Sequence, residues 1–187
     1  MPNTKQPNKN KNRKKSYGKE FERQVFKNFS EVEGVSIDRI PDQVTRYKNT
    51  SSNICDFIVY KKPTLLYLEC KSVHGNTLSI YSVPKKGKDG KLHGFYGNIR
   101  DNQWEGLLEK SQIEGVRAGI LIWFVDKDVT IYLSISALEY ARQCGDKSIR
   151  FDTDRFDLFS DDTIIHIPAK KKRTMFEYDF SEFFNTI

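Results

Sequence analysis

The sequence lacks any segment long and apolar enough to cross a membrane. Its apolar runs have the length of single strands, whereas a membrane-spanning helix needs about 20 apolar residues. The N-terminus is polar and basic and has no apolar core of the kind found in a secretory signal. We therefore expect a cytoplasmic protein that does not associate with membranes.

Residues that build disulfide or zinc sites are also scarce. The three cysteines, at positions 55, 70 and 144, form no close pair, and the three histidines are scattered along the chain. This spacing argues against a disulfide framework and against structural zinc. We expect the three thiols to be buried and structural. No internal repeat is present, which argues against a repeat architecture.

The chain has 187 residues, and it contains 13 Phe and 9 Tyr, enough to build one well-packed core. Its formal charge of +6 is concentrated at one end. Residues 1–15 carry six basic side chains and no acidic one, which leaves 25 basic against 25 acidic residues in the remainder. We expect residues 1–15 to be a disordered basic arm that meets a polyanion such as DNA, or else a solvated leader. Residues 16–187 would form a single domain.

Apolar periodicity predicts alternating helices and strands. Phe21, Val25, Phe26 and Phe29 recur at helical spacing, and dense apolar runs elsewhere have strand length. Ser136 is a candidate helix cap, and Asp101 is another. The order fits an α/β fold with a mixed sheet flanked by helices. We expect helices over about 17–30, 101–112 and 136–144, and strands over 35–40, 54–60, 65–70, 119–125, 129–133 and 164–167.

Charged residues interrupt two of the most apolar strands. Asp56 lies in the first of them, and Glu69 and Lys71 lie in the second. Because strand side chains alternate, Glu69 and Lys71 point to the same face and Cys70 points to the other. Ionised groups in buried strands cost several kcal/mol unless they are paired or bind a metal.

This arrangement predicts a metal-dependent hydrolytic site. Carboxylates on adjacent strands suit Mg²⁺ or Mn²⁺, and the backbone carbonyl of Cys70 is a further candidate ligand. Lys71 would orient the attacking water and stabilise charge that develops on a phosphate. The alternative is a structural ion pair of Lys71 with Glu69 or Asp56, because the bare spacing of these residues is common.

Several short motifs surround this pair of strands in a fixed order. The sequence resembles the PD-(D/E)xK nuclease superfamily and, within it, the RecU-like Holliday junction resolvases of Gram-positive bacteria and their phages. The resemblance extends from Gly18 to about Arg150. It is carried by Gly18-Lys19-Glu20-Phe21-Glu22, Asp38-Arg39-Ile40-Pro41-Asp42, Asp56 with Glu69-Cys70-Lys71, the stretch from Asn98 to Gln103, and Lys147-Ser148-Ile149-Arg150.

The resemblance implies a restriction-endonuclease-like fold and further site residues. Glu22, rather than Glu20, would support the metal site because it follows the aromatic residue as in the family pattern. Gln103 would face the active site from its helix. Cys55 stands where the family's proline precedes the first Asp, which affects the metal site little. The loop at about 41–53 is a short version of the stalk that reaches into the junction centre in bacterial members.

Three basic segments are candidate DNA contacts. The stalk-like loop and the strand before it offer cations and one aromatic ring, and residues 85–91 form a Gly-rich hairpin or loop. Each has the alternative of an ordinary solvated segment. With the arm, the candidates are Arg13, Lys14, Lys15, Arg39, Arg46, Tyr47, Lys48, Lys85, Lys86, Lys88 and Lys91.

The resemblance implies a homodimeric endonuclease that resolves four-way DNA junctions by paired nicks in opposing strands. Paired nicking needs two active sites related by a dyad. Host recombination or branch-migration proteins are possible further partners. The alternatives are another structure-selective, repair or restriction nuclease of the same fold, and a non-catalytic DNA-binding protein that modulates recombination.

Overall fold

The computed structural model describes residues 17–41, 53–81, 99–152, 164–173 and 176–187, and for residues 83–86, 92–96 and 175 it describes the backbone alone. The predicted basic arm at 1–15 and nearly all of the stalk-like loop at about 41–53 lie outside these residues. No helix among the described residues is long and apolar enough to cross a membrane.

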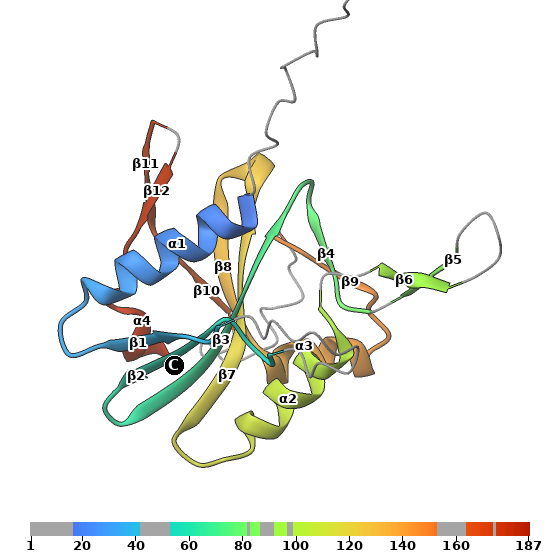
Figure 1. The fold of residues 1–187 in the computed structure, drawn as a ribbon, viewed down its shortest axis with the longest axis horizontal. Coiled ribbons are helices and arrows are strands. Elements are labelled where there is room, and N and C mark those ends of the chain that lie inside the picture. Colours follow the sequence, from blue (N-terminus) through green and yellow to red (C-terminus); the bar gives the residue numbers. More distant parts are fainter. Residues whose placement is uncertain are drawn as a thin grey trace, which may run out of the picture.

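A six-stranded mixed sheet forms the centre of the molecule (Figure 1). Its strand order is β1-β2-β3-β7-β8-β10, and only the central β3–β7 pair is parallel. This confirms the predicted α/β class with a mixed sheet. The strands are β1 (Ser36–Arg39), β2 (Phe57–Lys61), β3 (Thr64–Val73), β7 (Val116–Phe124), β8 (Val129–Ser134) and β10 (Ile164–His166).

Within the described part of the chain, three two-stranded ribbons accompany the sheet. One ribbon pairs β4 (Thr77–Ser79) with β9 (Ser148–Arg150), and another pairs β11 (Ala169–Lys172) with β12 (Met175–Tyr178). The third pairs β5 (Val83–Lys86) with β6 (Leu92–Tyr96), which bears out the hairpin predicted around residues 85–91.

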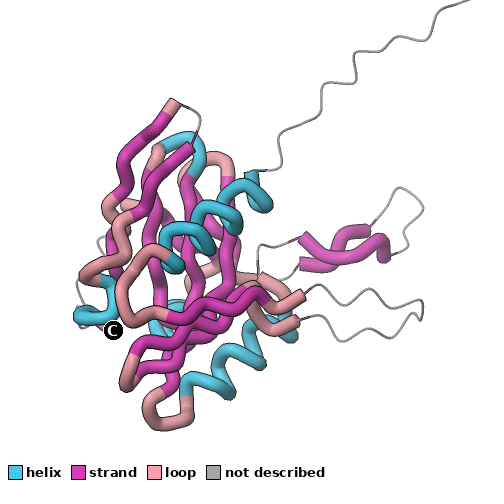
Figure 2. The backbone as a smooth tube through the Cα atoms, turned by 60° about the vertical axis from the view of Figure 1, so that its left-hand side comes forward, coloured by secondary structure: helices cyan, strands magenta, loops and turns pink. Residues whose placement is uncertain are grey.

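Helices cover both faces of the sheet, and the strands separate α1 from α2 in Figure 2. One buried cluster joins the sheet to α2 (Asp101–Ser111) and α3 (Ile135–Gln143). The other joins it to α1 (Tyr17–Ser30), β12 and the short α4 (Phe183–Thr186). Because side chains of β3 alternate between these clusters, Leu66, Leu68 and Cys70 face α1. Glu69 and Lys71 therefore face α2.

Most predicted elements are present, and the differences have local causes. The N-cap of helix α3 lies two residues earlier than predicted, because Ser134 and not Ser136 accepts a hydrogen bond from the Ala137 amide. The N-cap position of α2 is occupied by Arg100, and Asp101, the predicted cap, is the first residue of the helix. Cys55 and Cys70 are buried as expected, but Cys144 is exposed because α3 ends just before it.

Candidate active site

Glu69 and Lys71 meet on the face of β3 that α2 covers. Lys71 Nζ donates to Glu69 Oε1 across 2.5 Å, as the two-residue period of a strand allows. The Glu69 carboxylate is almost fully buried, with 4% of its side chain exposed, and the Lys71 side chain is 17% exposed. The pair therefore lies at the edge of the core rather than on an open surface.

Gln103, near the start of α2, completes a closed set of hydrogen bonds with this pair. Its Nε2 donates to Glu69 Oε1 at 2.6 Å, and its Oε1 accepts from Lys71 Nζ at 3.1 Å. The same Oε1 accepts from the Arg100 amide at 3.3 Å. Because Gln103 is buried and held from both sides, it sets the orientation of both charged groups.

Gly106 allows α2 to approach the strands this closely. A Cβ at this position would lie 2.4 Å from Cγ2 and 2.9 Å from Cβ of Ile54, which real contacts essentially never show. Ile54 stands two residues before Asp56. Gly106 was not among the predicted site residues, although an isolated glycine within a helical pattern is a signal of such packing.

Asp56 lies at the same corner but just before β2 rather than within it, which corrects the sequence-based placement in the strand. Its Oδ2 accepts a hydrogen bond from the Cys70 amide at 2.8 Å, and its own amide donates to the Leu68 carbonyl at 3.1 Å. Asp56 is thus fixed against β3, on the backbone next to Glu69.

The environment of Glu69 favours binding of a positive charge. The pKa of Glu69 is raised to about 7, chiefly by burial and also by the negative charge of Asp56, while Lys71 and Gln103 act in the opposite direction. Among the described residues, Glu69 Oε2 is buried without a hydrogen-bond partner. An unsatisfied buried carboxylate oxygen is costly. A cation bound to this oxygen would relieve that cost.

The corner offers two of the oxygen donors that Mg²⁺ or Mn²⁺ takes. Asp56 and Glu69 supply two carboxylates, and Mg²⁺ is commonly held by one or two carboxylates together with water and substrate phosphates. Within the described part of the chain, no group of three or more His, Cys, Asp and Glu side chains is placed to hold a metal ion. The remaining ligands would therefore be backbone, water or substrate.

Glu22 lies on α1, on the other side of this corner. Its Oε2 accepts from Arg39 Nη2 at 2.6 Å. Burial chiefly raises the pKa of the Cys70 thiol, and the charges of Asp56, Glu69 and Glu22 add to this shift. The structure brings Asp56, Glu69, Lys71 and Gln103 together and pairs Glu22 with Arg39. The metal-binding roles of Glu22 and of the Cys70 carbonyl stay predictions.

The alternative choice on α1, Glu20, has different partners. Its carboxylate accepts from Arg23 at 2.5 Å and from Gln24 at 3.3 Å. His74, just beyond the Glu69–Lys71 strand, is exposed and meets Asp126 at 2.9 Å. Trp104 and Trp123 are buried, one in each of the two core clusters.

Only one predicted DNA contact has a described side chain. Arg39 ends β1, and 52% of its side chain is exposed. Lys85 and Lys86 lie on β5, where the backbone alone is described. The other candidates lie outside the described residues; they are Arg13, Lys14, Lys15, Arg46, Tyr47, Lys48, Lys88 and Lys91.

Comparison with known proteins adds a weak structural likeness. No protein-family model and no curated protein matches the sequence. Among solved structures, the chain is similar to Hjc of Archaeoglobus fulgidus, a Holliday junction resolvase from an archaeal hyperthermophile, with 15% identity and a TM-score of 0.43. The match covers 64% of this chain and 78% of that one. At this TM-score the likeness carries no argument, and the proposals below rest on the chain's own residues.

Proposed function

We propose that the protein is a metal-dependent endonuclease that hydrolyses DNA phosphodiester bonds at the corner formed by Asp56, Glu69 and Lys71. The observation that carries this proposal is the buried Glu69 Oε2, which has no hydrogen-bond partner among the described residues. A purely structural ion pair would not need a second carboxylate beside it, whereas a divalent cation needs such a pair of oxygens.

Each residue of the corner has a role in this proposal. Asp56 and Glu69 would hold Mg²⁺ or Mn²⁺ with the Cys70 carbonyl, water and substrate oxygens as further ligands, and Glu22 would support the metal site from α1. When bound, the ion would polarise the scissile phosphate and lower the pKa of a coordinated water. Lys71 orients the attacking water and stabilises the charge that develops on the phosphate oxygens.

The Lys71 ammonium has the geometry for this role. Two partners, Glu69 and Gln103, receive hydrogen bonds from it, and an ammonium has three N–H donors. The third donor would serve the water or the phosphate. Gln103 holds Lys71 and Glu69 in one fixed arrangement, so the groups need little reorganisation when substrate binds.

As substrate we propose a four-way DNA junction that is cut by paired nicks in opposing strands. This choice rests on the sequence resemblance to RecU-like resolvases and on the order of its motifs. Symmetric nicking needs two active sites related by a dyad, so the protein would act as a homodimer. Host recombination or branch-migration proteins would be further partners.

The shortness of the loop at about 41–53 favours one alternative, a nuclease of the same fold that acts on a flap, nick or duplex. A substrate panel separates the two. We expect labelled four-way junctions to be cut with Mg²⁺ or Mn²⁺ and not with EDTA, and to be preferred over duplex at raised salt. Nonspecific phosphate binding weakens first as salt rises. A junction preference below a few-fold under these conditions would favour the alternative.

A further inference from the structure

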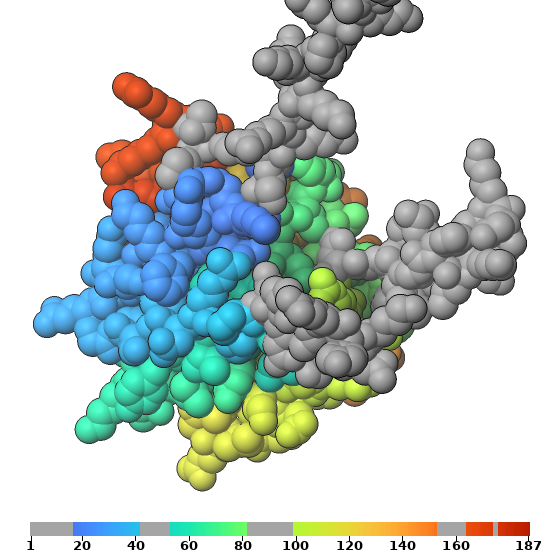
Figure 3. All heavy atoms as spheres, in the orientation of Figure 1, coloured from blue at the N-terminus to red at the C-terminus, as the bar shows by residue number. Residues whose placement is uncertain are grey.

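A groove beside the candidate active site is lined by both aromatic and cationic side chains. It has a volume of about 610 Å³ and lies between α1 and the first two strands, whose surfaces adjoin on the face drawn in Figure 3. This volume falls in the range of pockets that hold small organic ligands. Its lining residues are Lys19, Glu20, Glu22, Arg23, Phe26, Arg39 and Phe57.

The groove adjoins the catalytic corner through two of its lining residues. Phe57 directly follows Asp56 in the chain. Arg39 pairs with Phe57 across β1 and β2, and the next amide, that of Ile40, donates to the Asp56 carbonyl at 2.9 Å. A strand whose phosphate is cut at Asp56 and Glu69 would therefore pass the groove with its neighbouring nucleotide.

We infer that this groove holds one nucleotide of the strand that is cut, with its base against Phe26 and its phosphate beside Arg23 and Arg39. The inference rests on the proposed nuclease function and adds a substrate subsite to it. No residue of this subsite apart from Glu22 and Arg39 was a candidate from the sequence.

Phe26 provides the surface for the base. The helical pattern predicts that it faces the core with Phe21, but it is 41% exposed while Phe21 is buried. Its ring packs against Phe57 with centroids 6.2 Å apart, and Phe57 itself is fully buried. An aromatic ring anchored on the core and open to solvent is what base stacking requires, and stacking accepts any base.

The two arginines provide the phosphate contacts. The Arg23 and Arg39 side chains are 66% and 52% exposed, whereas their carboxylate partners Glu20 and Glu22 are 17% and 19% exposed. The arginine side chains are thus more exposed to solvent than the carboxylates with which they pair. A guanidinium has five N–H donors in a fork that matches a phosphate. Each arginine can therefore donate to a phosphate as well as to its carboxylate.

Charge balance makes stacking the main contribution of this groove. Its lining carries three cations, Lys19, Arg23 and Arg39, and two carboxylates, so the net attraction for a phosphate is small. Lys19, Arg23 and Phe26 recur at helical spacing and share one face of α1. The groove therefore presents a mixed aromatic and cationic surface toward the strand, as proteins that bind single-stranded nucleic acid do.

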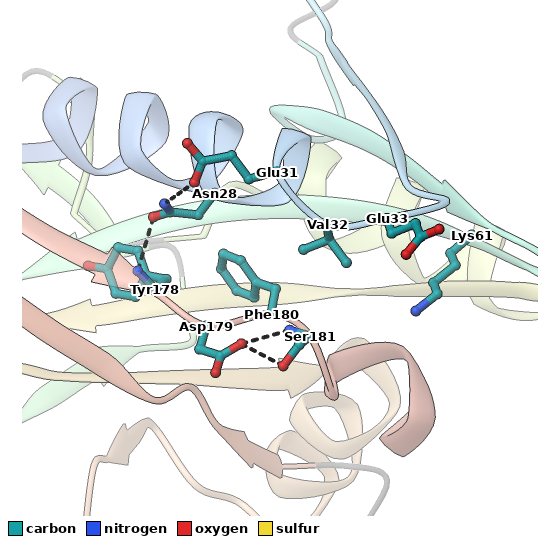
Figure 4. Close-up of a pocket in the computed structure, with 9 residues that line it drawn as sticks. All are labelled: Asn28, Glu31, Val32, Glu33, Lys61, Tyr178, Asp179, Phe180 and Ser181. Carbon is teal, nitrogen blue, oxygen red and sulfur yellow. Dashed lines mark hydrogen bonds between the residues drawn. The ribbon is translucent and has the colours of Figure 1, made fainter.

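A second groove on the same molecule has a predominantly acidic lining. It has a volume of about 470 Å³ and lies where α1 ends beside β12 (Figure 4). Three carboxylates, Glu31, Glu33 and Asp179, line it against a single cation, Lys61. Phosphate would be repelled there, so nucleic acid is expected in the first groove and not in the second.

The experiment measures binding of a fluorescein-labelled single-stranded oligonucleotide, and of a four-way junction, by anisotropy in EDTA so that nothing is cut. Phe26→Ala should weaken single-strand binding about 5- to 100-fold, the range that stacking of one base provides. Phe26→Tyr, which keeps the ring, should bind like the wild type. Tyr60→Ala is the matched control, since Tyr60 is a similarly exposed aromatic on β2, and its binding should stay close to that of the wild type.

Phe26→Trp gives a direct readout of stacking that does not depend on the alanine variant folding. The native tryptophans are buried, so fluorescence of the new one should be quenched by bound oligonucleotide. Absence of quenching, or equal binding by Phe26→Ala and the wild type, would overturn the subsite while leaving metal-dependent cutting intact. Absence of both DNA binding and cutting in the wild type would overturn the nuclease proposal itself.

Discussion

Replacing Glu69 by Gln should make the protein more stable at neutral pH when no divalent cation is present. Burial raises the pKa of Glu69 from its ordinary value of 4.5 to about 7, and the charge of Asp56 adds to the shift. The native state therefore holds this proton more tightly than the unfolded state does. The free energy of unfolding then falls as the pH rises from about 4.5 to 7, because the unfolded state binds fewer protons over this window.

The size of this loss follows from the two pKa values. Each pH unit between them costs about 1.4 kcal/mol, so the full loss is about 3 kcal/mol as an upper figure. The Gln variant has no such group and escapes the loss. Its advantage over the wild type should therefore be small near pH 4.5, grow up to about pH 7, and then stay level.

Urea unfolding in EDTA at several pH values between about 5 and 8 measures this difference across the window in which Glu69 loses its proton. Replacing EDTA by Mn²⁺ at the upper end of this range should stabilise the wild type, since a ligand that binds only the native state shifts the unfolding equilibrium. The Gln variant should gain little from Mn²⁺. A stability difference that does not change with pH would refute the electrostatic reasoning, and equal stabilisation of both proteins by Mn²⁺ would refute Glu69 as a ligand.

Three further predictions concern residues around the site and the N-terminal arm. Gln103→Leu should fold but cut about 10- to 100-fold more slowly in single-turnover assays, because it removes a group that orients Glu69 and Lys71; an unchanged rate would exclude this role. Gly106→Ala should lower the free energy of unfolding by about 1–3 kcal/mol in urea titrations, because its Cβ would overlap Ile54; unchanged stability would mean that α2 can shift without cost. Deletion of residues 1–15 should weaken junction binding and flatten its salt dependence, by about 0.9 in the log–log slope for each phosphate that the arm neutralises in the intact protein; an unchanged slope would remove the arm from DNA binding.

Features set by short-range periodicity could be predicted from the sequence. Helix α1 spans the residues expected from the spacing of its phenylalanines. Glu69 and Lys71 share a face because strand side chains alternate, and this alone placed them together. The apolar runs at β7 and β8 are central strands of the sheet, which assigns them to the core.

Features set by the packing of distant residues could not be predicted from the sequence. The Glu22–Arg39 pair joins residues 17 positions apart, and its formation depends on where β1 lies against α1. Phe26 follows the apolar pattern of its helix, yet its ring is 41% exposed. The close approach at Gly106 depends on Ile54, which belongs to a different segment of the chain.

The central claim is that DNA is cut with a divalent cation at Asp56, Glu69 and Lys71, and cleavage of a labelled synthetic four-way junction tests it most directly. The wild type should cut with Mg²⁺ or Mn²⁺ and not with EDTA. Asp56→Ala and Lys71→Ala should bind the junction but not cut it, while Glu105→Ala, an exposed carboxylate on α2, should cut normally. Cutting by either site variant at the wild-type rate, or by the wild type in EDTA, would contradict the claim.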